Sequence, residues 1–243
     1  MAGDAPAAEL DYDWRVVVEL GTETDPLLIR FSVGPPPTGI SSFDSYALRS
    51  ASGWIFVDPV QPTRAAAARL ALLIRERPVA ALLTQDGHER FCYAAREQWG
   101  TPVWGPQPGV GQRPVGYRGR PDRLYAEGDS LPGGLRAVKL AGLSRTDHAL
   151  LWQPPGAAPF LFTGDVLNGQ VDTDLASPDH HRRAPAIYFG SQPRYVARHA
   201  NPPALKASVT RLLDLEFDAI AGSHARPFRD APQTALARLL ETI

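Results

Sequence analysis

The segment that most constrains the fold is a continuous apolar run, Val79–Thr84, which reads Val-Ala-Ala-Leu-Leu-Thr. A strand with one solvent-exposed face alternates apolar and polar residues, and this run offers no polar residue before Thr84. The run is followed at once by a polar segment, Gln85–Arg90. We therefore predict a strand that is buried on both faces and that delivers a cluster of polar side chains at its end.

Segments rich in β-branched and aromatic residues predict strands on both sides of this run. They are Val16–Val18, Leu27–Val33, Tyr46–Leu48, Trp54–Val57, Pro102–Trp104, Leu135–Leu140, His148–Trp152, Phe160–Phe162 and Phe217–Ala221. Helical spacing and end signals predict helices, namely Thr63–Arg77, Phe91–Trp99, Ala204–Leu213 and Ala231–Leu240. Strand clusters separated by helices indicate two packed sheets with helices outside, a layered αββα or α/β arrangement.

The composition is that of an ordinary globular protein, because 44% of the 243 residues are hydrophobic and 21% are charged. No repeat or long low-complexity linker divides the chain. We therefore expect a flexible N-terminus at residues 1–10 and a single domain over residues 11–243. Two Gly-, Pro- or polar-rich stretches, 105–122 and 177–203, are predicted to be surface loops beside a cleft, and Tyr188 in the second is a candidate to line it.

Charge and composition narrow the classes of partner. The formal net charge is -1 and the arginines form no basic stripe, so we expect no nucleic-acid partner. No apolar run reaches the roughly 18 residues that a membrane span needs, and the first residues lack the pattern of a signal peptide. We expect a cytoplasmic protein with a small-molecule substrate or ligand.

The single cysteine, Cys92, allows no internal disulfide, and its expected role is that of a small buried apolar residue.

Five segments, in the correct order, resemble the metallo-β-lactamase superfamily. They correspond to the family's opening hairpin with its terminal aspartate, the strand that leads into its T-H-x-H-x-D-H motif, the region of its third metal histidine, the strand ending in Gly-Asp, and the strand ending in its last metal histidine. In this chain they are Asp44–Leu48 with Gly53–Asp58, Leu82–Thr84, Gly142–His148, Phe162–Asp165 and Gly222–His224. The resemblance covers residues 40–243 and implies a four-layer αββα sandwich.

The resemblance also shows which metal ligands are missing. Aligned from Thr84, the motif's His, His, Asp and His fall on Gln85, Gly87, Glu89 and Arg90, and the third histidine falls on Leu143. Glycine and leucine carry no side-chain ligand, so the family's first metal site is expected to be absent. Glu89, Asp165 and His224 are what remains of the second site. They imply at most one divalent metal, such as zinc, iron or manganese.

Arg90 offers an alternative to a metal, because its guanidinium cannot coordinate one but can neutralise carboxylates. We expect it to pair with Glu89 or Asp165. Asp86 and His88 would enter the first two ligand positions after a one-residue slip of the loop, but that slip would also place Arg90 in the aspartate position. The simpler expectation makes His88 a loop residue bonded to backbone. His148 is expected at the surface, at the end of its strand.

The resemblance implies hydrolysis of an ester, a lactone or a related bond, with Asp165 and His224 as catalytic residues. A metal-free binding or scaffold protein that keeps the fold and the cleft is the alternative. Metal-independent chemistry is a third hypothesis, in which His224 is a general base held by Asp165.

Overall fold

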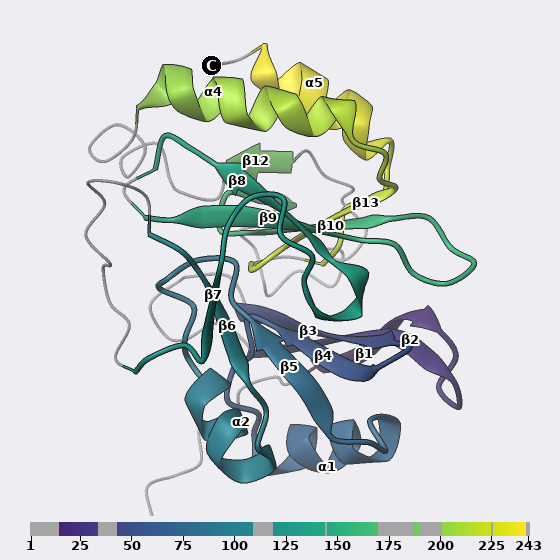
Figure 1. Cartoon of the computed structure of the whole chain (residues 1–243). Helices are drawn as coiled ribbons and strands as arrows, with labels where there is room; N and C mark the ends of the chain where they lie inside the picture. Colours follow the sequence, from purple (N-terminus) through teal and green to yellow (C-terminus); the bar gives the residue numbers. More distant parts are fainter. Residues whose placement is uncertain are drawn as a thin grey trace, which may run out of the picture.

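A computed structural model describes residues 15–33, 43–108, 119–143, 145–169, 187–189, 201–224 and 226–241. The segment 1–10 and most of the predicted loop 177–203 lie outside these ranges. Figure 1 shows four layers, with α4 and α5 above a four-stranded sheet, a seven-stranded sheet below it, and α1 and α2 at the bottom. The predicted αββα sandwich is therefore confirmed.

The seven-stranded sheet follows chain order, with β1 to β4 antiparallel and β4 to β7 parallel. Its strands are β1 (Arg15–Gly21), β2 (Pro26–Val33), β3 (Phe43–Ser50), β4 (Gly53–Val57), β5 (Pro78–Leu82), β6 (Val103–Pro106) and β7 (Arg123–Tyr125). The prediction for the apolar run is confirmed in β5. Ala80 and Leu82 belong to the core between the sheets, whereas Ala81 packs in the core beneath the helices on the other face.

The four-stranded sheet has the order β13-β10-β9-β8. Its strands are β8 (Arg136–Leu140), β9 (Asp147–Trp152), β10 (Phe160–Gly164) and β13 (Ala219–Gly222). Only the β10–β13 pair is parallel. A separate antiparallel pair that the sequence did not predict joins β11 (Leu167–Gly169) to β12 (Ile187–Phe189).

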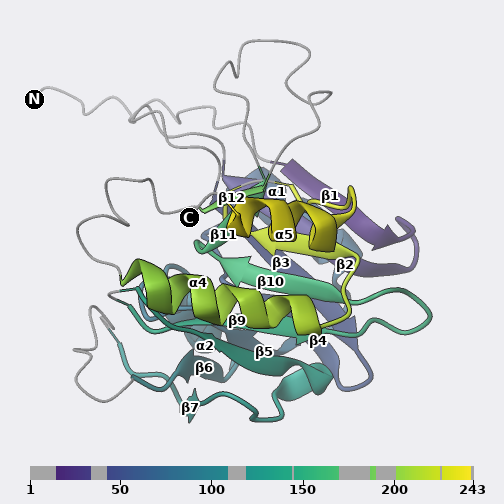
Figure 2. The same ribbon diagram turned by 90° about the horizontal axis from the view of Figure 1, so that it is seen from above.

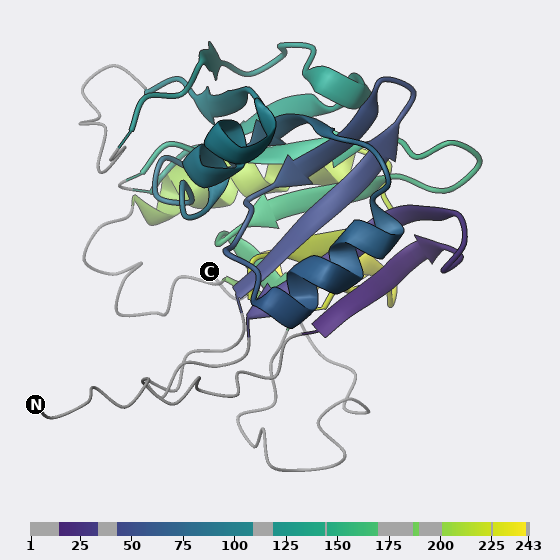
Figure 3. The same cartoon turned by 90° about the horizontal axis from the view of Figure 1, so that it is seen from below.

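Two helices cover the outer face of each sheet. Figure 3 shows α1 (Arg64–Leu73) and α2 (Cys92–Trp99) on the larger sheet, and Figure 2 shows α4 (Pro202–Thr210) and α5 (Pro232–Leu240) on the smaller one. Thr63 caps α1 by accepting a hydrogen bond from Ala66 N. This helix is shorter than predicted, because Ile74 adopts an extended conformation and residues 74–77 form the connection to β5.

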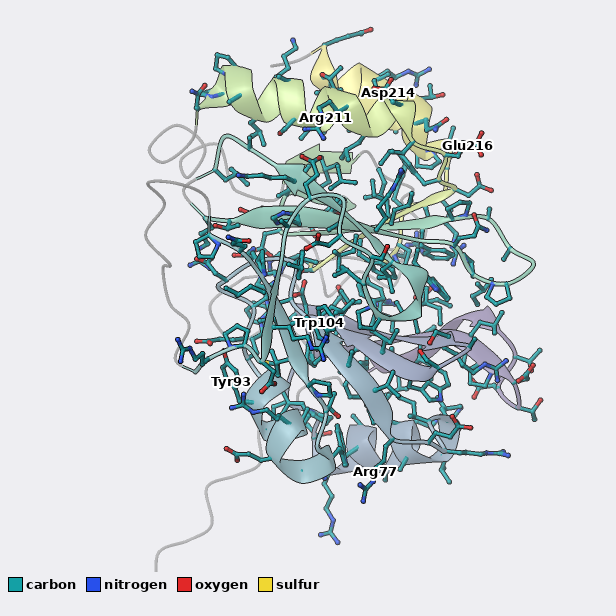
Figure 4. All side chains as sticks on the ribbon, viewed as in Figure 1. Arg77, Tyr93, Trp104, Arg211, Asp214 and Glu216 are labelled. Atoms are coloured by element: carbon teal, nitrogen blue, oxygen red, sulfur yellow. The ribbon has the colours of Figure 1, made fainter. Side chains whose placement is uncertain are left out.

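The side chains fill the spaces between the layers, as Figure 4 shows, and form three apolar cores. The core between the sheets includes Tyr46, Leu82, Trp152, Phe160 and Phe162. Trp104, labelled in Figure 4, packs against the edge of this core. Among the described residues, no helix is long and apolar enough to cross a membrane.

Candidate functional site

The candidate site lies where strands of both sheets end. Asp58 follows β4 and Thr84 follows β5, and these two strands are parallel neighbours. Asp165 follows β10 and His224 follows β13, which are also parallel neighbours. Carboxyl ends of parallel strands meet at one sheet edge, so residues distant in sequence converge there.

The centre of the site is His88, whose side chain is only 2% exposed and lies between two carboxylates. Its Nδ1 is 2.9 Å from Oδ2 of Asp58, and its Nε2 is 3.0 Å from Oδ1 of Asp165. Asp58 also accepts hydrogen bonds from the backbone N and the Oγ1 of Thr84, at 2.8 and 2.6 Å. It does so from the left-handed region, with φ at 48°, which is uncommon for a residue other than glycine.

Three side chains contact the carboxylate of Asp165. His224 Nε2 lies 3.0 Å from Oδ1, the same oxygen that His88 approaches, and Gln85 Nε2 donates to Oδ2 at 2.9 Å. The two imidazole contacts are ion pairs by distance, although their angles fall outside ordinary hydrogen-bond geometry. The Asp165 side chain is 33% exposed and that of His224 is 14% exposed, so solvent reaches this end of the cluster.

The charges of this cluster follow from the contacts. Burial by itself would lower the pKa of His88, but the Asp165 and Asp58 carboxylates outweigh it and raise the pKa to about 9. Burial would raise the pKa of Asp165, yet His88 and His224 hold it well below its ordinary value. At neutral pH the cluster is therefore an imidazolium held between carboxylates. The expectation that His88 is a loop residue bonded to backbone is wrong.

A second side-chain pair fills the position of the missing ligands. Arg145 Nη1 donates to Oε1 of Gln85 at 2.9 Å, and Gln85 in turn donates to Asp165. The Arg145 guanidinium lies so close to Gly87 that a Cβ at this position would overlap it. Glycine at position 87 thus gives the arginine its space, where the family alignment placed a histidine ligand.

The expected ion pair of Arg90 is not present. Within the described ranges, no salt bridge joins Arg90 to Glu89 or Asp165, and its guanidinium carbon instead lies 4.6 Å from the ring centroid of Phe43. Glu89 accepts a long hydrogen bond from Gly119 N, at 3.4 Å. The cation that contacts Asp165 is His88, because the chain turns after Thr84 in a way that points this imidazole inward.

The residues present do not fit the family's two-metal centre. Gly87 and Leu143 carry no ligand atom, and Leu143 packs against the apolar core beneath α4 and α5. In the part of the chain that the structure describes, no three His, Cys, Asp or Glu side chains are arranged to hold a metal ion. The predicted set of Glu89, Asp165 and His224 is thus not brought together as three ligands.

The other candidate residues fall in different places. Asp86 is fully buried, and Cys92 is also fully buried in the core beneath α1 and α2, where burial raises its thiol pKa to about 12. The predicted apolar role of Cys92 is confirmed.

Tyr188 lies in β12, and the position of its side chain is outside what the structure describes. Asp147 follows the position of the lost third histidine, but the sequence assigns it no role. Burial and the nearby Asp165 raise the pKa of its carboxyl to about 7.

His148 was expected at the surface, but its side chain is 2% exposed. It lies within β9 and packs edge-on against Tyr125, with ring centroids 5.2 Å apart. Neither ring nitrogen has a hydrogen-bond partner among the described residues. Burial, assisted by Lys139 on the neighbouring strand, lowers the pKa of His148 to about 4, so this imidazole is neutral in the folded protein.

This burial predicts a specific acid sensitivity. Between pH 6.5 and 4 the unfolded chain protonates His148 and the folded chain does not, so stability falls as pH falls through this window. The loss is about 3 kcal/mol, since each pKa unit corresponds to about 1.4 kcal/mol. We expect His148→Leu to remove that part of the acid loss. Urea unfolding of both proteins at pH 7, 5.5 and 4 measures it, and parallel stability curves would contradict it.

No family model and no curated protein sequence matches the chain. Solved structures do. A metallo-β-lactamase from Pontibacter korlensis aligns with a TM-score of 0.63 and 13% identity over 95% of this chain and 100% of that one. A protein solved in a di-iron-bound form aligns with a TM-score of 0.61 and 23% identity over 88% and 100%.

A mutant flavo di-iron protein from Thermotoga maritima aligns with a TM-score of 0.66 and 13% identity over 94% of this chain. The match covers 62% of that protein, so this chain spans less than two thirds of its length. Together these likenesses show that the chain has the metallo-β-lactamase fold.

Proposed function

We propose that this chain is a hydrolase-like protein of the metallo-β-lactamase fold that works without a metal ion, with His224 as general base and Asp165 as the residue that holds it. The observation that supports the proposal is the contact of 3.0 Å between His224 Nε2 and Asp165 Oδ1, at the end of the cluster that solvent reaches. The substrate class is an ester, a lactone or a related acyl compound.

The charge of Asp165 indicates which nitrogen of His224 carries the proton and which acts as the base. Asp165 is ionised, and its Oδ1 lies 3.0 Å from His224 Nε2, so we assign the His224 proton to Nε2. Nδ1 is then the basic nitrogen of the ring. A water molecule that attacks the acyl carbon gives a proton to Nδ1. When the carbon–oxygen bond to the leaving group breaks, the departing alkoxide receives that proton from Nδ1. The backbone N of His224 donates to Asn168 Oδ1 at 2.9 Å, which fixes the position of the base.

A second candidate function is binding of a small molecule without turnover. It is favoured by the number of groups that share the charge of Asp165. Oδ1 contacts the His88 imidazolium as well as His224, and Oδ2 accepts from Gln85. Negative charge that Asp165 shares with His88 and Gln85 is less available to stabilise charge that develops at His224 during a reaction, so this arrangement lowers the catalytic gain that Asp165 provides.

The test is a hydrolysis assay on full-length protein that was purified without a chelator and without a histidine tag. Activated aryl esters and simple lactones are the substrates, each assayed with and without a chelator. We expect slow turnover that the chelator does not change. Turnover that the chelator abolishes would contradict the metal-independent mechanism. Absence of turnover on every substrate would leave the binding function as the better account.

Metal content provides a separate prediction. Because Gly87 and Leu143 supply no ligand and Arg145 fills the space beside Gly87, we expect less than one equivalent of bound metal per chain. Elemental analysis after dialysis against zinc, iron and manganese salts measures it. One stoichiometric metal would contradict the prediction and would indicate His88 and His224 as its ligands, since both Nε2 atoms face Asp165 Oδ1.

A further inference from the structure

Arg90 is a cation at the edge of the site that no acidic side chain contacts within the described ranges. Its side chain is exposed, and its guanidinium carbon lies 4.6 Å from the centroid of the Phe43 ring. A guanidinium over an aromatic face is held in place by the ring quadrupole while its N–H groups remain directed to the sides. Phe43 therefore positions this charge without neutralising it.

The carboxylates whose charges act most strongly on Arg90 have other partners. Asp165, Asp58 and Asp44 are the acidic groups that act on Arg90 at longer range. Each has its own partner at contact distance. Asp165 and Asp58 pair with His88, and Asp44 accepts a hydrogen bond from Arg30 Nη1 at 2.9 Å. Among the described residues, the structural role of countercharge is thus already filled, and no described acidic side chain takes up the charge of Arg90.

The same phenylalanine connects Arg90 to His224. The ring centroids of Phe43 and His224 are 5.4 Å apart, so Arg90 and the proposed base both lie against one aromatic ring. We propose that Arg90 and Phe43 form a subsite that binds the carboxylate of the substrate, a few bonds away from the acyl group at His224. This rests on the proposed function for the identity of the reacting group, but not for the anion site itself.

The chemistry favours a carboxylate over a phosphate. A guanidinium binds either group through paired hydrogen bonds. The charges of Asp165, Asp58 and Asp44 still act at the position of Arg90, although each carboxylate has a partner. They therefore repel a phosphate monoester, which carries nearly two negative charges at neutral pH, more than a carboxylate. A singly charged carboxylate meets less repulsion, so monoesters of dicarboxylic acids and lactones that carry a carboxylate are the substrates that this subsite fits.

The first experiment compares monomethyl glutarate with dimethyl glutarate, which differ in one negative charge. For the wild type we expect a higher kcat/KM on the anionic ester. Arg90→Gln should reduce the ratio of the two kcat/KM values by about ten- to hundredfold, the loss typical of one hydrogen bond to a charged group. Arg90→Lys should retain part of the preference, because it keeps the charge but not the paired geometry.

Arg229→Gln is the matched control. The Arg229 guanidinium carbon also lies 4.6 Å from an aromatic centroid, that of Phe160, and the side chain is likewise exposed. Phe160 begins β10 whereas Asp165 follows its end, so this variant removes a cation–aromatic contact, together with the hydrogen bond from Arg229 Nη2 to Glu19 O, away from the site. Its kcat/KM ratio should equal that of the wild type. An Arg90→Gln protein that retained the wild-type ratio would overturn the subsite.

A binding measurement separates this proposal from the proposed hydrolysis. Calorimetric titration with glutarate should give heat in the wild type and in Arg229→Gln but not in Arg90→Gln, whether or not any ester is turned over. Glutarate binding that depends on Arg90, without turnover, would support the subsite and overturn the hydrolysis. Glutarate binding that is independent of Arg90 would overturn the subsite. Tighter binding of inorganic phosphate than of glutarate would overturn the assignment to a carboxylate.

Discussion

Replacing His88 with alanine is expected to lower the free energy of unfolding by about 3–5 kcal/mol at pH 7, the typical effect of removing one member of a buried charge pair. The imidazolium contacts Asp58 at 2.9 Å and Asp165 at 3.0 Å. Without it, no cation among the described residues contacts Asp58, because its remaining side-chain partner in this cluster is the neutral Thr84. Urea unfolding of wild type and variant at pH 7 measures the difference.

The pH dependence gives this prediction a definite sign. The pKa of His88 is raised to about 9 in the folded state, above its ordinary value of 6.5. Its contribution is therefore fully present below pH 6.5 and is lost as the pH rises through 9, which amounts to about 3 kcal/mol. Wild type should lose this stability between pH 6.5 and 9, whereas His88→Ala should not, and the gap between the two proteins should narrow at high pH.

A double-mutant cycle tests whether the charge is responsible. Asp165→Asn removes the negative charge that His88 neutralises, so it should be less harmful in the His88→Ala background than in the wild type. Arg96→Ala is a suitable control, since this arginine forms an exposed ion pair with Asp122 and should cost about 1 kcal/mol or less. If His88→Ala proved as stable as wild type at pH 7, the imidazolium could not be the countercharge of the cluster.

The pattern of the sequence predicts long strands and helices better than short ones. Residues Leu27–Val33 and the apolar run before Thr84 appear as β2 and β5, because enough side chains are buried there to leave a recognisable pattern. The strands β7, β11 and β12 each have three residues, which is too short for periodicity to register. They exist because neighbouring strands offer backbone partners, and no local sequence signal encodes that.

The sequence predicts some residues of the candidate site but not others. Asp165 and His224 could be predicted because each follows a buried strand at a position that the family resemblance marks, and the structure brings them together at 3.0 Å. His88 could not be placed. Its two carboxylate partners, Asp58 and Asp165, follow β4 and β10. Only the three-dimensional packing shows that this histidine, rather than Arg90, turns towards them.

His224→Ala is expected to reduce kcat/KM for ester hydrolysis by about 10²–10⁴-fold, the usual contribution of a positioned general base. His224 is the better target than Asp165, because removing Asp165 would also leave the His88 imidazolium without one of its carboxylates and would destabilise the fold. The His224 side chain is 14% exposed at the solvent end of the cluster, so its removal should leave the folded structure largely intact. Steady-state kinetics and a thermal melt of each protein separate the two effects.

Added imidazole distinguishes a chemical role of His224 from a structural one. The alanine variant leaves a space beside Asp165 and next to the Phe43 ring, against which the His224 ring now packs with centroids 5.4 Å apart. Imidazole from solution can enter that space, accept the proton of the attacking water, and restore part of the turnover in proportion to its concentration. His224→Gln fills the space without a basic nitrogen, so imidazole should not rescue it. A His224→Ala protein with wild-type kcat/KM would remove His224 from the mechanism, and an equal response of both variants to imidazole would show that the rescue does not occur at this position.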